Sequence, residues 1–127
     1  MTELGRGWTG GNQFRPAREV EIKYGHGLLG DESSKWPRNV VITTPTAWKT
    51  ARPHISHEPA GVGFVNMLDW DHLEETSNAL PDDAELVVGV GGGTALDASK
   101  YVALKKDLPL ILVPTVVSTG AIIHGIF

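Results

Sequence analysis

The stretch 85–117 limits the possible folds of this chain more than any other part of it. It begins with an apolar run at 86–90, and a nearly continuous apolar run of this length is typical of a strand buried on both faces. Gly91, Gly92 and Gly93 follow, and their lack of side chains allows a sharp backbone turn. An amphipathic segment and a second apolar run ending in Pro-Thr complete the stretch. The pattern predicts one βαβ unit with a glycine-rich turn between its first strand and its helix.

This turn is the first candidate for a binding site. Thr94 is predicted to begin the helix, with Asp97 three residues later in the spacing of a capping box. Bare backbone N–H groups and the positive end of a helix dipole favour an anion such as phosphate. Because open α/β sheets bind ligands at the carboxyl ends of their strands, the turn is predicted to hold a nucleotide or phosphate.

Two established glycine motifs do not match, which leaves a second interpretation open. Thr94 stands where the dinucleotide fingerprint G-x-G-x-x-G would have its last glycine, and no Gly-Lys-Ser/Thr follows as a P-loop requires. The glycines would then serve only to let the helix pack closely against the strand.

A family resemblance rests on the same residues. The segments GGGTALDASKYVA at 91–103 and PLILVPTVVSTGA at 109–121 resemble the linked motifs of the iron-containing alcohol dehydrogenase superfamily. That superfamily includes glycerol dehydrogenase, glycerol-1-phosphate dehydrogenase and, more distantly, dehydroquinate synthase. The positions in register with its first motif are Gly91, Gly92, Gly93, Thr94, Asp97, Lys100 and Ala103. The resemblance implies a Rossmann-like nucleotide-binding half of an oxidoreductase.

The resemblance also implies site residues. The backbone at 91–94 would hold the pyrophosphate of NAD or NADP, while Thr115 and Ser118 would line the nicotinamide end. Lys100 would either reach a phosphate or be an ordinary exposed helix lysine. No catalytic and no metal-ligating residue is assigned. The expected cofactor-binding residues are Gly91, Gly92, Gly93, Thr94, Asp97, Thr115, Ser118 and Thr43.

Thr43 enters this set because it ends a compact apolar strand predicted at 39–43. At about this place the family commonly carries an aspartate that binds the adenosine ribose. Here Thr43, Thr44 and Pro45 follow one another, and the absence of a carboxylate leaves the 2′-phosphate of NADP permitted. In the alternative interpretation the threonines only cap a short helix that starts at Pro45.

The other predicted elements follow from local patterns. Residues 1–18 are expected to be a flexible lead-in, and 19–127 an NAD(P)-binding α/β domain. A parallel sheet with helices on both faces is predicted, in the order β-β-α-β-α-β-α-β. An alternative left open is that the first strands form a hairpin-like edge. Besides the elements above, we predict strands at 19–24 and 64–68, a loop at 25–30, a loop at 52–63, and a helix from Asp69 or Asp71 to Leu80.

Metal and acid–base alternatives are less well supported by the pattern. His54 and His57 have the spacing H-x-x-H, but the flanking prolines Pro53 and Pro59 argue against a helix that would bring them together. The segment that contains His54 and His57 is therefore interpreted as a solvated loop, the usual case for such a sequence. The acidic residues between 69 and 75 suit a helix N-terminus, although paired carboxylates for acid–base chemistry would have the same composition.

Composition limits the class of protein to which this chain can belong. The 127 residues, 41% hydrophobic and 20% charged, are those of one globular domain. A net charge of −4 without a basic run argues against nucleic-acid binding, and the absence of cysteine excludes disulfides and cysteine metal sites. No apolar run approaches the ~20 residues of a membrane span, so no membrane partner is expected. A cytoplasmic location is the default expectation.

The chain also departs from the family pattern. Gly120 stands where polyol-type relatives have an aspartate, and His124 is the only nearby candidate ligand for a metal. The family's helical C-terminal domain, which supplies the iron or zinc ligands, does not follow Phe127. A truncated chain, inactive alone, is therefore expected. Its apolar end 121–127 favours a missing C-terminal half or a homo-oligomer as partner.

Three functions are consistent with these observations. The chain is predicted to be the nucleotide-binding N-terminal domain of a metal-dependent NAD(P) alcohol, polyol or polyol-phosphate dehydrogenase. In the complete family enzyme the metal would polarise the alcohol oxygen while hydride passes to the nicotinamide. The alternatives are a lyase domain similar to dehydroquinate synthase, and a free-standing nucleotide-binding module without catalysis.

Overall fold

The described part of the chain contains alternating strands and helices. The computed structural model describes residues 21–23, 27–66, 68–115 and 122–125, so the lead-in expected at 1–18 lies outside these ranges. No described helix combines the length and the apolar character that crossing a bilayer requires. The elements are β1 (Glu21–Lys23), α2 (Leu28–Ser33), β2 (Asn39–Thr43), α3 (Pro45–Ala51), the 3-10 helix η1 (Arg52–His54), β3 (Gly61–Phe64), α4 (Trp70–Ala79), β4 (Leu86–Gly91), α5 (Gly93–Lys106), β5 (Leu110–Pro114) and β6 (Ile122–Gly125).

The strands form one sheet in the order β1-β6-β5-β4-β2-β3. β3, β2, β4 and β5 are parallel, as predicted, whereas β6 runs antiparallel to β5 and β1 antiparallel to β6. The α/β class is therefore confirmed, with two antiparallel strands added at one edge. The suggested hairpin-like edge of the first two strands is wrong, because β1 pairs with β6 while β2 lies between β4 and β3.

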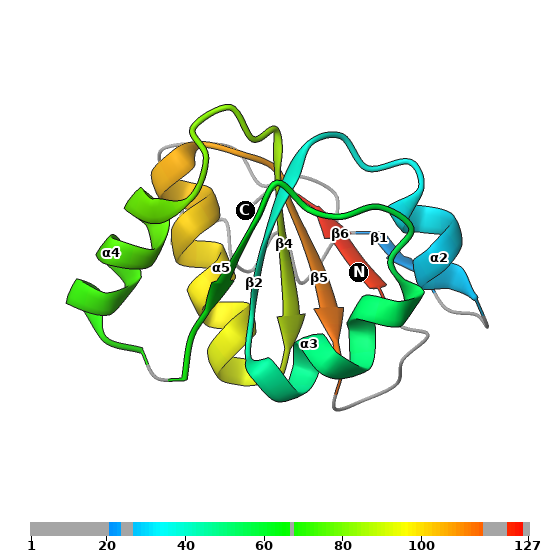
Figure 1. Cartoon of the computed structure of the whole chain (residues 1–127), viewed down its shortest axis with the longest axis horizontal. Helices are drawn as coiled ribbons and strands as arrows, with labels where there is room; N and C mark the ends of the chain where they lie inside the picture. The colour runs from blue at the N-terminus through cyan, green and yellow to red at the C-terminus, as the bar shows by residue number, and fades with distance from the viewer. Residues whose placement is uncertain (1–20, 24–26, 67, 116–121, 126–127) are drawn as a thin grey trace.

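Helices cover both faces of the sheet, as predicted (Figure 1). α4 and α5 pack on one face, where alternate residues of β2 and β4, such as Val40, Ile42 and Val87, are buried. α2 and α3 pack on the other face against Val41 and Val88. β4 lies at the centre, and each of its six residues is buried, which confirms the prediction of a strand covered on both faces. Complete burial of one such valine contributes about 1.5–3 kcal/mol.

The third strand lies three residues earlier than predicted. It spans Gly61–Phe64 instead of 64–68. Glycines are found in this strand because neighbouring residues pack too closely against it to leave room for side chains. A Cβ at Gly63 would lie 2.6 Å from Cγ2 of Thr76 in α4, and one at Gly61 would lie 2.9 Å from Cδ of Pro81. Of the apolar residues that suggested the later strand, Phe64 and Leu68 are exposed, whereas Val65 is buried just after β3 ends.

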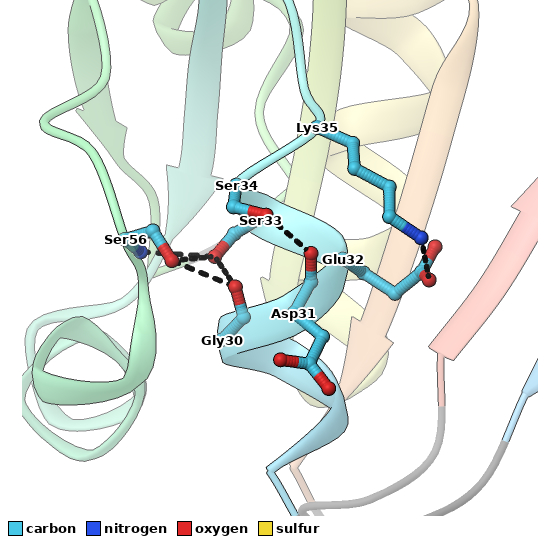
Figure 2. A network of polar contacts seen from close by, with 7 residues as sticks. All are labelled: Gly30, Asp31, Glu32, Ser33, Ser34, Lys35 and Ser56. Atoms are coloured by element: carbon cyan, nitrogen blue, oxygen red, sulfur yellow. Dashed lines mark hydrogen bonds and ion pairs between the residues drawn. The ribbon is translucent and has the colours of Figure 1, made fainter.

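The segment predicted as a loop at 25–30 contains the start of helix α2. Gly27 precedes the helix in the left-handed region, with φ 71°, a conformation that glycine adopts without strain. Contacts distant in sequence stabilise the helix, as Figure 2 shows: the Ser56 hydroxyl donates to the Gly30 carbonyl oxygen at 2.7 Å, and the Ser56 N–H donates to the Ser33 hydroxyl at 2.9 Å. These bonds join α2 to the loop after η1.

The N-termini of α3 and α4 agree with the predictions. Thr44 caps α3, since its hydroxyl accepts a hydrogen bond from the Ala47 N–H at 3.3 Å, and Pro45 occupies the first turn. Asp69 caps α4, with its carboxylate 3.1 Å from the Asp71 nitrogen. Both caps lie near the edge of the sheet where β2 and β3 end.

Candidate functional site

The carboxyl ends of the parallel strands meet at one edge of the sheet. Thr43 of β2 lies opposite Val90 of β4, and Gly91 lies opposite Pro114 of β5. The Thr115 N–H donates to the Gly91 carbonyl oxygen at 3.1 Å, which continues the ladder past the end of β5. The predicted site residues Thr43, Gly91 and Thr115 therefore belong to one row at the edge where open α/β sheets bind ligands.

Gly91 turns the chain from β4 into α5 and admits no side chain. Its φ of +139° is a conformation that residues with a side chain rarely adopt. A Cβ there would also lie 3.0 Å from Cβ of Ala95 in α5 and 3.4 Å from Cβ of Ala47 in α3. Gly91 thus brings the starts of two helices on opposite faces of the sheet close to the same strand end.

Gly93 is different, because packing gives no reason for a glycine there. Among the residues that the structure describes, a Cβ at Gly93 would have no heavy atom within 4 Å, so they leave the space beside the first turn of α5 open. The N-cap residue is Gly92, and no side chain in the described part of the chain caps the helix. The backbone N–H groups of this turn, at the positive end of a 14-residue helix, are accessible to an anionic group.

The predicted capping box of Thr94 and Asp97 is wrong. Gly92 has the extended backbone of an N-cap residue, with φ −90° and ψ −163°, so the helix begins at Gly93 and Thr94 is already its second residue. Asp97 instead lies 3.7 Å from the Lys100 ammonium, and both side chains are substantially exposed. Such exposed pairs contribute about 1 kcal/mol or less.

Close packing, the alternative explanation of the glycines, does apply to Gly89. A Cβ there would lie 2.2 Å from the Ser99 hydroxyl oxygen, which is buried and donates to the Leu96 carbonyl oxygen at 2.6 Å. The glycines of the turn region therefore divide between two roles. Gly89 and Gly91 allow α5 to approach β4, and Gly93 leaves space open at the helix start.

The other predicted site residues differ in how exposed they are at the edge of the sheet. Thr43 is completely buried, and its hydroxyl lies 3.3 Å from the Thr44 carbonyl oxygen, so it does not face the open edge in this structure. Thr44, which the alternative interpretation assigned to helix capping, has that role. Thr115 is partly exposed immediately after β5, and Ser118 lies outside the described residues.

A polar cluster that the sequence analysis did not identify joins α4 to α5. Glu74 accepts a hydrogen bond from the Tyr101 hydroxyl at 2.9 Å and another from the Lys105 ammonium. Lys105, followed by Tyr101, holds the pKa of Glu74 below its ordinary value, and the bond to Glu74 raises the pKa of Tyr101. Tyr101 and Lys105 lie one helix turn apart in α5, at positions i and i+4. This spacing places both side chains on the same face of the helix, and it is the sequence signal that could have indicated the cluster.

Possible metal ligands do not come together in the described part of the chain. His54 ends η1, His57 follows in the next loop, and both are exposed. Across the described ranges, no three His, Asp or Glu side chains form a group that could hold a metal ion.

Comparisons with known proteins agree with this architecture. The family model described as "Iron-containing alcohol dehydrogenase" matches residues 25–123. Glycerol dehydrogenase 1 of Schizosaccharomyces pombe is 41% identical over 59 residues, which are 46% of this chain and 12% of that protein. Glycerol-1-phosphate dehydrogenase [NAD(P)+] of Thermoplasma volcanium is 27% identical over 108 residues, with 75% of this chain and 31% of that protein covered.

A solved structure has the same arrangement. The crystal structure of glycerol dehydrogenase from Schizosaccharomyces pombe superposes with a TM-score of 0.55 and 26% identity, covering 70% of this chain and 25% of that one. The chain thus spans a third or less of the length of these relatives.

Proposed function

The chain belongs to the iron-containing alcohol dehydrogenase family, and on this premise we propose that it binds the dinucleotide cofactor of an NAD(P)-dependent dehydrogenase. The carboxyl edge formed by β2, β4 and β5 is the binding surface. The observation that carries the proposal is the start of α5: an uncapped first turn beside a glycine whose side-chain space is open.

The pyrophosphate would be held by backbone groups rather than by charged side chains. The N–H groups of Gly92, Gly93 and Thr94 supply donors at the positive end of the α5 dipole. The missing side chain at Gly93 lets a phosphate oxygen approach the backbone closely. Thr115, partly exposed beside Gly91, would border the bound cofactor toward its nicotinamide end.

When bound, the nicotinamide would accept or donate a hydride. The iron that the family name implies does not fit the described residues, because their His, Asp and Glu side chains form no group of three. We therefore assign no metal-dependent step to them. Their proposed contribution is to bind and orient the dinucleotide.

The names of two relatives support a proposal for the substrate class. These relatives are named for glycerol and for glycerol 1-phosphate. We propose that the reaction served by this domain is the oxidation of a polyol or polyol phosphate, or the reverse reduction. The nucleotide site and the family membership support this proposal, and the substrate itself would bind outside the residues discussed above.

The end of β2 bears on the choice of cofactor. Thr43, Thr44 and Pro45 place no carboxylate there to repel a 2′-phosphate. The relative from Thermoplasma volcanium is named for use of either NAD or NADP. We propose that this chain accepts both cofactors.

Titration of the purified 127-residue chain with NADH and with NADPH, followed by nicotinamide fluorescence, tests the proposal. Saturable binding of both is expected, and Gly92→Asp should weaken it at least about tenfold by placing a carboxylate beside the phosphates. Ala79→Asp adds the same charge at the exposed end of α4 and should leave the affinity unchanged. Absence of saturable binding by a folded chain, or equal effects of the two variants, would contradict the proposal.

A further inference from the structure

A separate hollow lies between the C-terminal ends of α4 and α5. These two helix ends are at the upper left of Figure 1. The 14 residues of α5 separate the hollow from the glycine turn by about 20 Å. It is therefore not part of the proposed nucleotide site. Its volume is about 290 Å³, and its lining consists of Ser77, Asn78, Asp82, Lys105, Lys106 and Leu108.

Ser77 gives this hollow an unused hydrogen-bonding group. The residue is only 1% exposed, yet its hydroxyl has no hydrogen-bond partner among the residues that the structure describes. Buried hydroxyls in proteins are normally paired, either with protein atoms or with water or a ligand. The neighbouring Asn78 adds a side-chain amide, another donor, to the same lining.

Lys106 adds to the lining an ammonium group whose positive charge is only weakly compensated by a neighbouring carboxylate. Its side chain is 13% exposed, and its ammonium lies 3.7 Å from a carboxylate oxygen of Asp82, whose side chain is fully exposed. A pair of this length with an exposed partner contributes little. Lys105, by contrast, is paired closely with the Glu74 carboxylate, so its charge is largely compensated.

We propose that the hollow binds the phosphate group of a small metabolite. The Lys106 ammonium supplies the charge, and the Ser77 hydroxyl and the Asn78 amide supply donors from α4. A tetrahedral phosphate offers several acceptor oxygens to donors that come from two helices, and Leu108 supplies an apolar wall for the carbon part of the ligand. The partial negative charge of the two helix ends opposes binding, and the Lys106 ammonium offsets it. Asp82 can turn into water, since its side chain already lies there.

An NMR titration of the full chain with inorganic phosphate tests the proposal. Chloride is exchanged for phosphate at constant ionic strength, and the chain carries Gly92→Asp so that the nucleotide site is impaired. We expect saturable shifts at the Asn78 side-chain amide and at the backbone amides of Lys106 and Leu108, with a Kd of the order of millimolar. Failure of cofactor binding at the glycine turn would not affect these signals, so the two proposals fail separately.

Two variants assign the donors. Lys106→Gln should weaken phosphate binding at least about tenfold, and Ser77→Ala several-fold, with alanine favourable in a helix. Lys35→Gln is the matched control, because Lys35 is an exposed lysine paired with Glu32 on the other face of the sheet. The proposal is overturned if no saturable shift occurs, or if neither Lys106→Gln nor Ser77→Ala weakens it. Equal affinity for acetate would overturn the assignment to phosphate.

Discussion

The glycines around the β4–α5 turn differ in what a side chain would meet at each position. At Gly89 a Cβ would collide with Ser99, at Gly91 it would contact Ala95 and require a strained backbone, and at Gly93 it would meet no atom within 4 Å. One short glycine-rich segment therefore combines close helix–strand packing with an accessible helix start. The packing residues fix where the first turn of α5 lies relative to the edge of the sheet.

Gly89→Ala tests this division at the level of stability. The added methyl group would lie 2.2 Å from the Ser99 hydroxyl oxygen and 2.6 Å from Ser99 Cβ, so α5 must shift away from β4. We expect a loss of about 1–3 kcal/mol in the free energy of unfolding, measured by urea denaturation. Gly93→Ala, which adds the same group into open space, should cause no loss. Equal urea midpoints for the two variants would contradict this account.

The glycine turn was predictable because its sequence signal is local, whereas its role as a binding site stays a prediction. An apolar run followed by glycines at a strand end predicts the turn, and the described residues Gly91, Gly92 and Gly93 occupy it. The complete burial of Thr43 was not predictable in the same way, since it depends on tertiary packing around the end of β2. Whether Ser118 joins the site stays a prediction.

At the scale of elements, errors occurred where tertiary contacts override local preference. β3 contains two glycines, which strands usually avoid, because α4 and Pro81 approach it too closely for side chains. α2 was predicted as a loop because its start is rich in glycine, and its serine bonds to the loop after η1 cannot be read from nearby residues. Helices α3 and α4 were correct, because caps at Thr44 and Asp69 are local signals.

The α4–α5 contact leads to a prediction about pH. Hydrogen bonds from Lys105 and Tyr101 lower the pKa of Glu74 in the folded chain from its ordinary 4.5. The contribution of Glu74 to stability is thus present above the ordinary pKa and is lost as the pH falls through the folded value. Glu74→Gln should lower the thermal midpoint near neutral pH, and this difference should disappear as both chains are acidified below the folded pKa of Glu74.

Glu75→Gln provides the control for this measurement, because Glu75 is exposed on the same helix. It should alter the midpoint far less near neutral pH. If the thermal midpoint of Glu74→Gln stayed lower than that of the unmodified chain by the same amount in neutral and in acid solution, the charge of Glu74 would not be what stabilises the contact between α4 and α5.

At the scale of the whole molecule, the order of strands was only partly accessible from sequence. The four parallel strands follow from alternation of strands and helices, which predicts βαβ connections. The pairing of β1 with β6 joins residues about a hundred positions apart, such as Ile22 and Ile123. No local sequence pattern predicts this pairing. The resulting sheet places β4 between β2 and β5, and among the described strands β3 lies at an edge and is bonded to β2 alone.

This arrangement predicts a gradient of backbone protection across the sheet. β4 is bonded on both sides and covered on both faces, so its amides should exchange with solvent only when the whole domain unfolds. Within the described ranges β3 pairs with β2 only, and its last residue, Phe64, is exposed, so local opening should release its amides first. Hydrogen exchange at increasing sub-denaturing urea distinguishes the two, because only global opening depends steeply on denaturant. β2, also an interior strand, should behave like β4. If β3 were protected as strongly as β4, the edge would have to be covered in solution, and its position as the terminal strand of a single chain's sheet would be contradicted.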